Sequence, residues 1–258
     1  MTGGAILEAR NLGIRFGGLQ ALKGFHMTLG ARDLVGVIGP NGAGKTTFFN
    51  LLTGVYDPTE GDLAVDGVDV APLKPFQICR LGVARTFQNI RLFGELTVEE
   101  NVLVALQPGL KGSLWSAAFR TRSYKAEEET ARGEAMRLLA LFGLERDRDE
   151  TAKNLSYGEQ RRLEIVRALA TRPRLLLLDE PAAGMNATEK KNLVELIRSV
   201  HRDHELAILL IEHDMSVVMT LCPRLIVLDY GEIIAEGTPE EVRKNPKVIE
   251  AYLGTTDQ

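Results

Sequence analysis

The sequence contains no apolar run that approaches the roughly 18–20 residues needed to span a bilayer. Its first ten residues also lack the basic start and the apolar stretch of a secretory signal. Only two cysteines occur, Cys79 and Cys222, and they are too isolated for a C-x-x-C motif or a disulfide framework. We therefore expect a reduced protein of the cytosol, which could act at a membrane only through a partner.

An excess of charge of one sign is also missing. With 31 basic and 35 acidic side chains, the net charge of −4 gives no electrostatic reason to expect a nucleic-acid partner. The apolar share of 45% is ordinary for a globular protein, and 258 residues allow a full core in one domain or two small lobes.

One segment is far more informative than the composition. Residues 39–46, Gly-Pro-Asn-Gly-Ala-Gly-Lys-Thr, fit the phosphate-binding pattern G-x-x-x-x-G-K-[ST]. Glycines let backbone N–H groups curl around an anion, Lys45 can reach the terminal phosphates, and the Thr46 hydroxyl can hold Mg²⁺. Residues 34–38 before the loop predict a buried strand, and a helix is expected over 46–53. A strand, a Gly-rich loop and a helix N-terminus together bind phosphate.

The apolar pattern changes along the rest of the chain. Short strands, among them 5–9 and 13–16, alternate with Gly-rich turns near the start, and the pattern from about 97 to 170 is helical. The apolar runs at 175–178 and 207–211 are typical of buried parallel strands. The sequence therefore predicts an α/β fold.

Chemically useful side chains follow these apolar strands. Asp179 is placed to hold Mg²⁺ opposite Thr46, and Glu180 could polarise an attacking water as general base. His213 could orient the same water, although a lone histidine is more often structural or solvated. Because ligands of open α/β sheets bind beyond the carboxyl ends of the strands, these residues and the phosphate loop point to one crevice.

Three further features each allow two interpretations. Ser156 and Glu159 form a capping box, S-x-x-E, but a helix N-terminus beside Gly158 is also an anion site, which could serve a second subunit's nucleotide. Phe16 could stack on an adenine ring or pack in the core. Gln88 could reach Mg²⁺ or the water, yet a glutamine in a loop indicates little by itself.

In this order, the motifs resemble the nucleotide-binding subunit of an ABC transporter over nearly the whole chain. The resemblance rests on Phe16, the phosphate loop, Gln88, a signature at 155–160, Asp179 with Glu180, and His213. It implies ATP contacts by Phe16, Gly39, Pro40, Asn41, Gly42, Ala43, Gly44, Lys45, Thr46, Thr47, Ser156, Gly158 and Glu159. It implies catalytic roles for Glu180, His213 and Gln88, and Mg²⁺ ligation by Thr46, Gln88 and Asp179.

The resemblance also implies a fold and partners. The fold would be a P-loop NTPase with a mostly parallel core sheet, an N-terminal antiparallel β subdomain and a helical signature subdomain. One ABC ATPase domain, 1–258, would comprise a nucleotide-binding core, 1–87 and 171–258, and a helical subdomain, 88–170. A second ATP-binding subunit, identical or a paralogue, would pack head to tail around ATP. Transmembrane permease subunits would hold the chain at the cytoplasmic face of the membrane, and a periplasmic or extracellular solute-binding protein would take part indirectly.

Finer features are similar to the branched-chain amino acid importers. These are residues 85–93, 182–186 and 248–254, and an extra stretch between 107 and 132. Packing of that stretch on its own lobe is favoured over a contact with a membrane subunit. The alternative is the ATPase of lipopolysaccharide export. Tyr157 departs from the pattern, because the general signature has glycine there.

Overall fold

The computed structural model describes residues 4–106 and 122–253. The chain forms two compact units, one of residues 1–85 with 174–258 and the other of residues 86–173. These boundaries lie close to the expected division at 87/88 and 170/171. The expected packing of the extra stretch falls largely on residues 107–121, outside the described residues.

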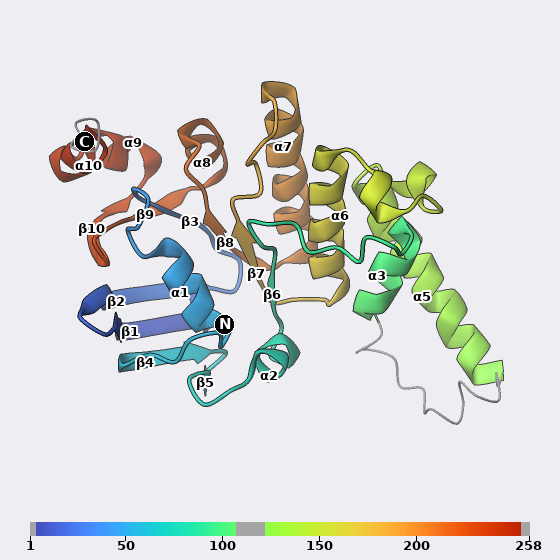
Figure 1. Ribbon diagram of the computed structural model, residues 1–258, viewed down its shortest axis with the longest axis horizontal. Helices are drawn as coiled ribbons and strands as arrows, with labels where there is room; N and C mark the ends of the chain where they lie inside the picture. The colour runs from blue at the N-terminus through green and yellow to red at the C-terminus, as the bar shows by residue number, and fades with distance from the viewer. Residues whose placement is uncertain (1–3, 107–121, 254–258) are drawn as a thin grey trace. The chain divides into compact units, whose positions relative to one another are not determined.

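A mostly parallel sheet forms the centre of the first unit (Figure 1). Its strand order is β10-β9-β3-β8-β7-β6, and only β10 runs antiparallel to its neighbour. The central strands are apolar and buried along their whole length, as a sheet covered on both faces requires. The bounds are β3 (Leu34–Ile38), β6 (Val83–Arg85), β7 (Leu175–Asp179), β8 (Ala207–Ile211), β9 (Arg224–Asp229) and β10 (Glu232–Gly237).

A second sheet of the same unit is antiparallel, in the order β2-β1-β4-β5. Its strands are β1 (Ala5–Phe16), β2 (Leu19–Gly30), β4 (Glu60–Val65) and β5 (Val68–Asp69). The short strands expected at 5–9 and 13–16 are one continuous strand, because register shifts within β1 keep it paired with β2 through the polar residues between them. The predicted α/β fold with a parallel core and an antiparallel β part is confirmed.

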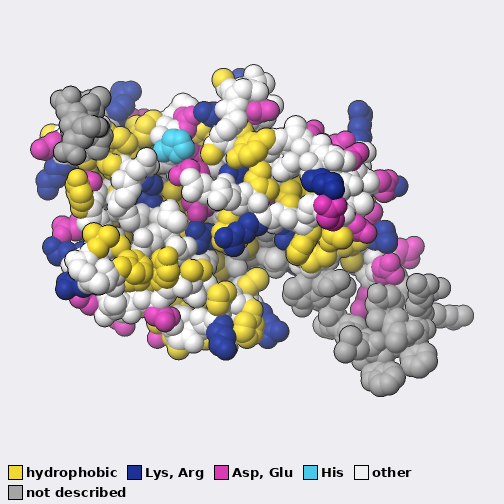
Figure 2. Space-filling view, in the orientation of Figure 1, with side chains coloured by type: hydrophobic (Ala, Val, Ile, Leu, Met, Phe, Trp, Pro, Cys, Tyr) yellow, Lys and Arg dark blue, Asp and Glu magenta, His cyan; other side chains and the backbone are white. Residues whose placement is uncertain are grey.

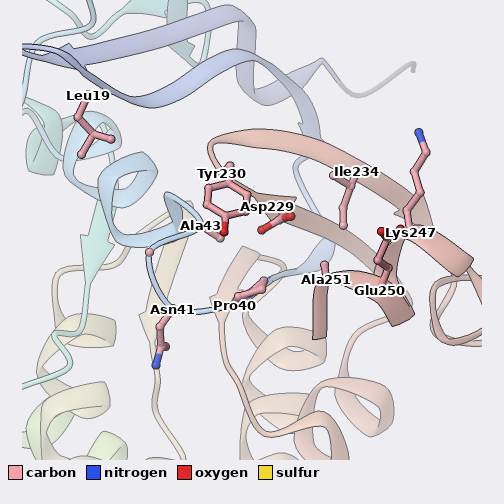
Figure 3. A pocket seen from close by; sticks show the side chains of 11 residues that line it. Leu19, Pro40, Asn41, Ala43, Asp229, Tyr230, Ile234, Lys247, Glu250 and Ala251 are labelled. Atoms are coloured by element: carbon pink, nitrogen blue, oxygen red, sulfur yellow. The ribbon is translucent and has the colours of Figure 1, made fainter. Parts of the chain in front are cut away.

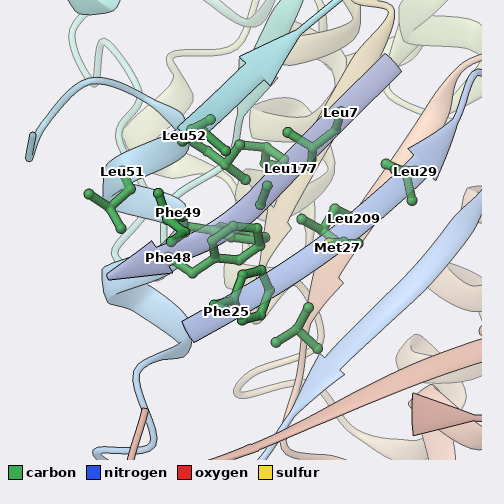
Figure 4. Close-up of a cluster of buried hydrophobic side chains, with 14 of the residues drawn as sticks. Leu7, Phe25, Met27, Leu29, Phe48, Phe49, Leu51, Leu52, Leu177 and Leu209 are labelled. Carbon is green, nitrogen blue, oxygen red and sulfur yellow. The ribbon is translucent and has the colours of Figure 1, made fainter. Parts of the chain in front are cut away.

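Helix α1 (Lys45–Leu52) fills the core of the first unit. Phe48 and Phe49 are fully buried, and the Phe48 ring centroid lies 4.2 Å from that of Phe25 on β2 (Figure 4). The cluster continues through Leu177 and Leu209 of the parallel sheet. Apolar burial therefore fixes the helix that follows the phosphate loop. The other helices of this unit are α2 (Pro75–Arg80), α7 (Ala187–His204), α8 (Met215–Leu221), α9 (Pro239–Lys244) and α10 (Pro246–Leu253).

The second unit is helical. It contains α3 (Val98–Leu106), α5 (Arg122–Leu141) and α6 (Tyr157–Ala170), with 3-10 turns at Glu145–Asp147 and Ala152–Asn154. Leu138, Leu139 and Phe142 are buried, and Gly143 adopts φ +66° just after α5. Among the residues described, no helix has the length and apolar character to cross a membrane. Basic, acidic and hydrophobic side chains are interspersed on the visible face (Figure 2).

The two cysteines differ in a way that thiol titration can measure. Cys79 is exposed on α2, whereas burial of Cys222 raises the pKa of its thiol to about 12. Because the thiolate is the reactive form, we expect a thiol reagent to modify one cysteine per native chain and both in denaturant. Cys79→Ser should abolish the fast native reaction; a fast-reacting thiol left in that variant would contradict this assignment.

Candidate functional site

The phosphate loop follows β3, and its glycines adopt conformations that other residues resist. Gly39 has φ +147° and Gly44 has φ +105°. A Cβ atom at Gly39 would lie 2.0 Å from the Leu228 carbonyl oxygen, and one at Gly44 would lie 2.6 Å from that of Ala21. Both positions therefore require glycine on steric as well as conformational grounds. The Gly231 N–H holds the loop by donating to the Ala43 carbonyl at 3.0 Å.

Lys45 is buried at the start of α1. Its Nζ donates to the carbonyl oxygens of Gly39 at 2.6 Å and Pro40 at 2.8 Å. Burial lowers the pKa of Lys45, while the nearby negative charges of Glu180 and Asp179 raise it. The cation therefore lies at the loop and within the field of Asp179, which ends β7, and of Glu180, which follows it.

Glu180 and His213 come from neighbouring strand ends. Glu180 adopts a left-handed φ of +49°, and its N–H donates to the Ile211 carbonyl at 2.9 Å. His213 Nδ1 lies 3.6 Å from Glu180 Oε2. A non-glycine residue in this backbone region costs about 1–3 kcal/mol unless its surroundings enforce it, and such residues cluster at functional sites. The first unit thus brings together the loop, Asp179, Glu180 and His213.

Glu212 is a buried residue of this site for which the sequence analysis proposed no role. Its carboxylate accepts the N–H groups of Ala182 at 2.8 Å, His213 at 3.1 Å and Asp214 at 3.3 Å. Burial raises the pKa of Glu212, and the bond from Ala182 opposes this rise. The carboxylate therefore anchors both the turn after Glu180 and the loop that carries His213. An acidic residue directly after an apolar strand was the available signal.

Phe16 ends β1 and is 44% exposed, so it is not a core residue. Its ring packs edge-on against Tyr56 with a centroid distance of 5.0 Å. This contact holds the ring at the surface of the first unit, where a ring face could serve for stacking.

A cavity of about 650 Å³ lies beside the phosphate loop (Figure 3). Pro40, Asn41, Gly42 and Ala43 line one side, and Lys247, Glu250 and Ala251 of α10 line another. The Tyr252 hydroxyl on the same helix is buried. Burial raises the pKa of Tyr252, whereas a hydrogen bond with the Gly39 backbone lowers it. Helix α10 therefore reaches the phosphate loop. No sequence motif indicated this contact.

The signature residues belong to the second unit. Ser156 caps α6, and Glu159 Oε2 accepts the Ser156 backbone N–H at 2.9 Å and its hydroxyl at 2.7 Å. These contacts lower the pKa of Glu159. Both halves of the predicted capping box are present. Tyr157 turns toward its own helix, and its hydroxyl lies 3.1 Å from Arg161 Nη2.

Gln88 also belongs to the second unit, and α6 holds the backbone around it. Arg161 donates to the Phe87 carbonyl at 2.5 Å and to the Gln88 carbonyl. Glu164 accepts the Phe87 N–H at 3.1 Å and pairs with Arg161 at 3.1 Å. Burial raises the pKa of Glu164. This buried pair fixes the segment of Gln88, and the sequence analysis gave neither residue a role.

Comparison with known proteins identifies the family. The ABC transporter family model matches residues 22–183, and a model described as branched-chain amino acid ATP-binding cassette transporter matches residues 232–258. The chain belongs to the ATP-binding cassette family of ABC transporters. It is 48% identical over 249 residues to the branched-chain amino acid transport ATP-binding protein LivG of Salmonella typhimurium and 46% identical to BraF of Pseudomonas aeruginosa. Both alignments cover 96% of this chain and 98% of the relative.

Other comparisons agree on the fold. The ADP conformation of MJ1267, an ATP-binding cassette of an ABC transporter, matches with a TM-score of 0.83 and 31% identity over 97% of this chain and 99% of that one. A dimeric ABC transporter cassette, MJ0796, matches with a TM-score of 0.76 and 25% identity over 90% and 98%. The lipopolysaccharide export protein LptB of Haemophilus influenzae is 33% identical over 97% of this chain and 98% of its own. As a member of this family the chain binds nucleotide.

The oxygen donors present fit Mg²⁺ bound together with phosphates. The Thr46 hydroxyl and the Asp179 carboxylate are hard oxygen ligands, which suit this ion. Across residues 4–106 and 122–253, no cluster of three His, Cys, Asp or Glu side chains could hold a metal alone.

Asp214 links the His213 loop to α7 and offers a test through pH. It caps α8, and Lys190 Nζ lies 2.5 Å from its Oδ2. The hydrogen bond from Lys190 and then that from Ser216 lower the pKa of Asp214. Asp214→Asn should therefore lower the free energy of unfolding at pH 7 by about 0.5–1 kcal/mol.

The sign of the pH dependence follows from the lowered pKa. The stabilisation is present above the unfolded-state pKa of about 3.9 and is lost as the pH falls through the lower native value. Urea unfolding should show the gap between wild type and Asp214→Asn at pH 7 and a smaller gap at pH 3.5. The exposed Asp57→Asn is the matched control, and a gap that grows on acidification would contradict the prediction.

Proposed function

We propose that this protein is the ATP-hydrolysing subunit of a transporter that imports branched-chain amino acids. ATP hydrolysis is supported by the grouping of the phosphate loop, Asp179, Glu180 and His213 in one unit. The substrate class rests on the relatives LivG and BraF and on the match at residues 232–258. Transported amino acid would not touch this chain, and a solute-binding protein would select it.

In this proposal, groups of the first unit and Gln88 bind and orient ATP from one side. The loop N–H groups and Lys45 would bind the phosphates, and Phe16 would stack on the adenine. Glu180 would accept the proton of the attacking water. His213, whose Nδ1 lies 3.6 Å from Glu180 Oε2, would orient that water. Thr46, Asp179 and Gln88 would hold Mg²⁺, which supplies charge neutralisation at the phosphates.

The signature would act on a second subunit's nucleotide. Ser156, Gly158 and Glu159 lie at the start of α6, where backbone N–H groups favour an anion. ATP that contacts both subunits only in a closed head-to-tail dimer favours closure through its binding energy. Gln88 and the helical unit would transmit this motion to transmembrane permease subunits, which would hold the chain at the cytoplasmic face of the membrane. The second subunit is a copy or a paralogue.

The assignment of Glu180 can be tested by one isosteric change. Glu180→Gln keeps the shape of the side chain and removes the base, so we expect ATP turnover to fall by about 10²–10⁴-fold. ATP affinity should stay near the wild-type value, and ATP should trap a dimer. Phosphate release and size-exclusion chromatography measure the two effects.

Glu195→Gln is the matched control, because Glu195 pairs with Arg198 on the surface of α7. It should hydrolyse ATP at the wild-type rate. Unchanged hydrolysis in Glu180→Gln would rule out Glu180 as the base.

The transporter itself can be identified from its partners. Gentle solubilisation of membranes that contain a tagged chain should copurify two different permease subunits and a second cassette chain. A depletion strain should then lose uptake of branched-chain amino acids. Lipopolysaccharide-export components in place of these permeases, with normal uptake, would favour the alternative exporter function, for which the 33% identity to LptB is the supporting observation.

A further inference from the structure

Arg85 is a buried cation at the carboxyl end of β6. Its side chain is 5% exposed, and that of its partner Asp179 is 4% exposed. Arg85 Nη2 donates to Asp179 Oδ2 at 2.8 Å. Its Nη1 donates to Asn50 Oδ1 at 2.8 Å and lies 3.2 Å from Thr53 Oγ1. The guanidinium carbon also lies 5.4 Å from the centre of the Phe49 ring.

These contacts join the elements that carry the two predicted Mg²⁺ ligands of the first unit. Arg85 pairs with Leu177 across the parallel strands β6 and β7, and Asp179 ends β7. Asn50 belongs to α1, the helix whose first turn contains Thr46. One planar guanidinium therefore contacts the Asp179 carboxylate on one side and helix α1 on the other.

Stability alone gives little reason for such an arrangement. Desolvation of two charges can cancel their attraction, and well-packed apolar residues of similar volume often stabilise a core as much or more. An arginine offers fixed donor directions, which hold a carboxylate in one orientation, and a lysine cannot match them. Orientation is therefore the property that distinguishes Arg85 from an apolar residue at the same place.

We propose that Arg85 is a positioning residue that fixes the Asp179 carboxylate relative to helix α1, and so sets the spacing between Asp179 and Thr46. The proposal rests on the proposed function, because the two side chains share a task only if Mg²⁺ binds there with ATP. Arg85 contacts neither nucleotide nor metal in this scheme and acts through Asp179.

The test separates this role from a purely structural one by comparing nucleotide affinity with and without Mg²⁺. A fluorescent ATP analogue is titrated onto the full chain in EDTA and in Mg²⁺, and the ratio of the two dissociation constants is the Mg²⁺ enhancement. Arg85→Met should lower this enhancement by about 10-fold or more, as is usual when a partner of a metal ligand is removed. Its affinity in EDTA should change by less than about twofold, because the loop contacts are intact.

Three further variants locate the effect. Arg85→Lys should recover only part of the enhancement, because it keeps the positive charge and loses the fixed donor directions of the guanidinium. Asp179→Asn should lose the enhancement, and adding Arg85→Met to it should cause no further loss. The surface variant Arg32→Met, which breaks an exposed pair with Glu205, should keep both affinities.

Asn50→Ala keeps the proposal testable if Arg85→Met does not fold. It removes the hydrogen bond from Arg85 Nη1 to Asn50 Oδ1 of α1 and keeps the pair with Asp179, and it should lower the enhancement while leaving the affinity in EDTA unchanged. A wild-type enhancement in Arg85→Met, or in Asn50→Ala, would overturn the proposal, as would an equal loss of affinity in EDTA and in Mg²⁺. Absence of any Mg²⁺ enhancement in the wild-type protein would instead contradict the proposed function.

Discussion

The structure depends on the pairing of buried charged side chains at the edge of the parallel sheet with partners of opposite charge or with backbone groups. Lys45 is buried at the start of α1, Asp179 at the end of β7 and Glu212 directly after β8. Such a charge costs several kcal/mol if it is left unpaired in the interior. Two carbonyl oxygens of the loop accept from Lys45, Arg85 pairs with Asp179, and three backbone N–H groups donate to Glu212. The loops therefore take the conformations that satisfy these charges.

Three helices of the described residues begin with the same device, and α1 differs from them. Reciprocal capping boxes begin α6, α7 and α9, at Ser156, Asn186 and Thr238. In each, side-chain oxygens accept the first backbone N–H groups, which have no partner within a helix. Helix α1 begins instead after Gly44, which has no side chain to offer. Because the same N–H groups bind anions, a bound phosphate can take the place of the cap.

Local sequence patterns predicted the phosphate loop, the buried strands and the capping box, because each depends on neighbours a few residues apart. The strand expected at 34–38 and that at 207–211 have those bounds in the structure. Arg85 was read only as part of a family-like segment, since its partner Asp179 lies 94 residues further on. A pair of residues so far apart in the chain produces no periodic pattern in the sequence around either of them. The catalytic and ligand roles of Glu180, His213 and Gln88 stay predictions, because no contact within one chain can test them.

Glu212 shows what such distant pairings add to the mechanics of the site. It accepts the Ala182 N–H on one side and those of His213 and Asp214 on the other. A buried carboxylate left without these donors would carry its full desolvation penalty. A shift of His213 should therefore carry the turn at 182–186 with it. The movement of these loops when a ligand binds then depends on Glu212 as well as on the residues that touch the ligand.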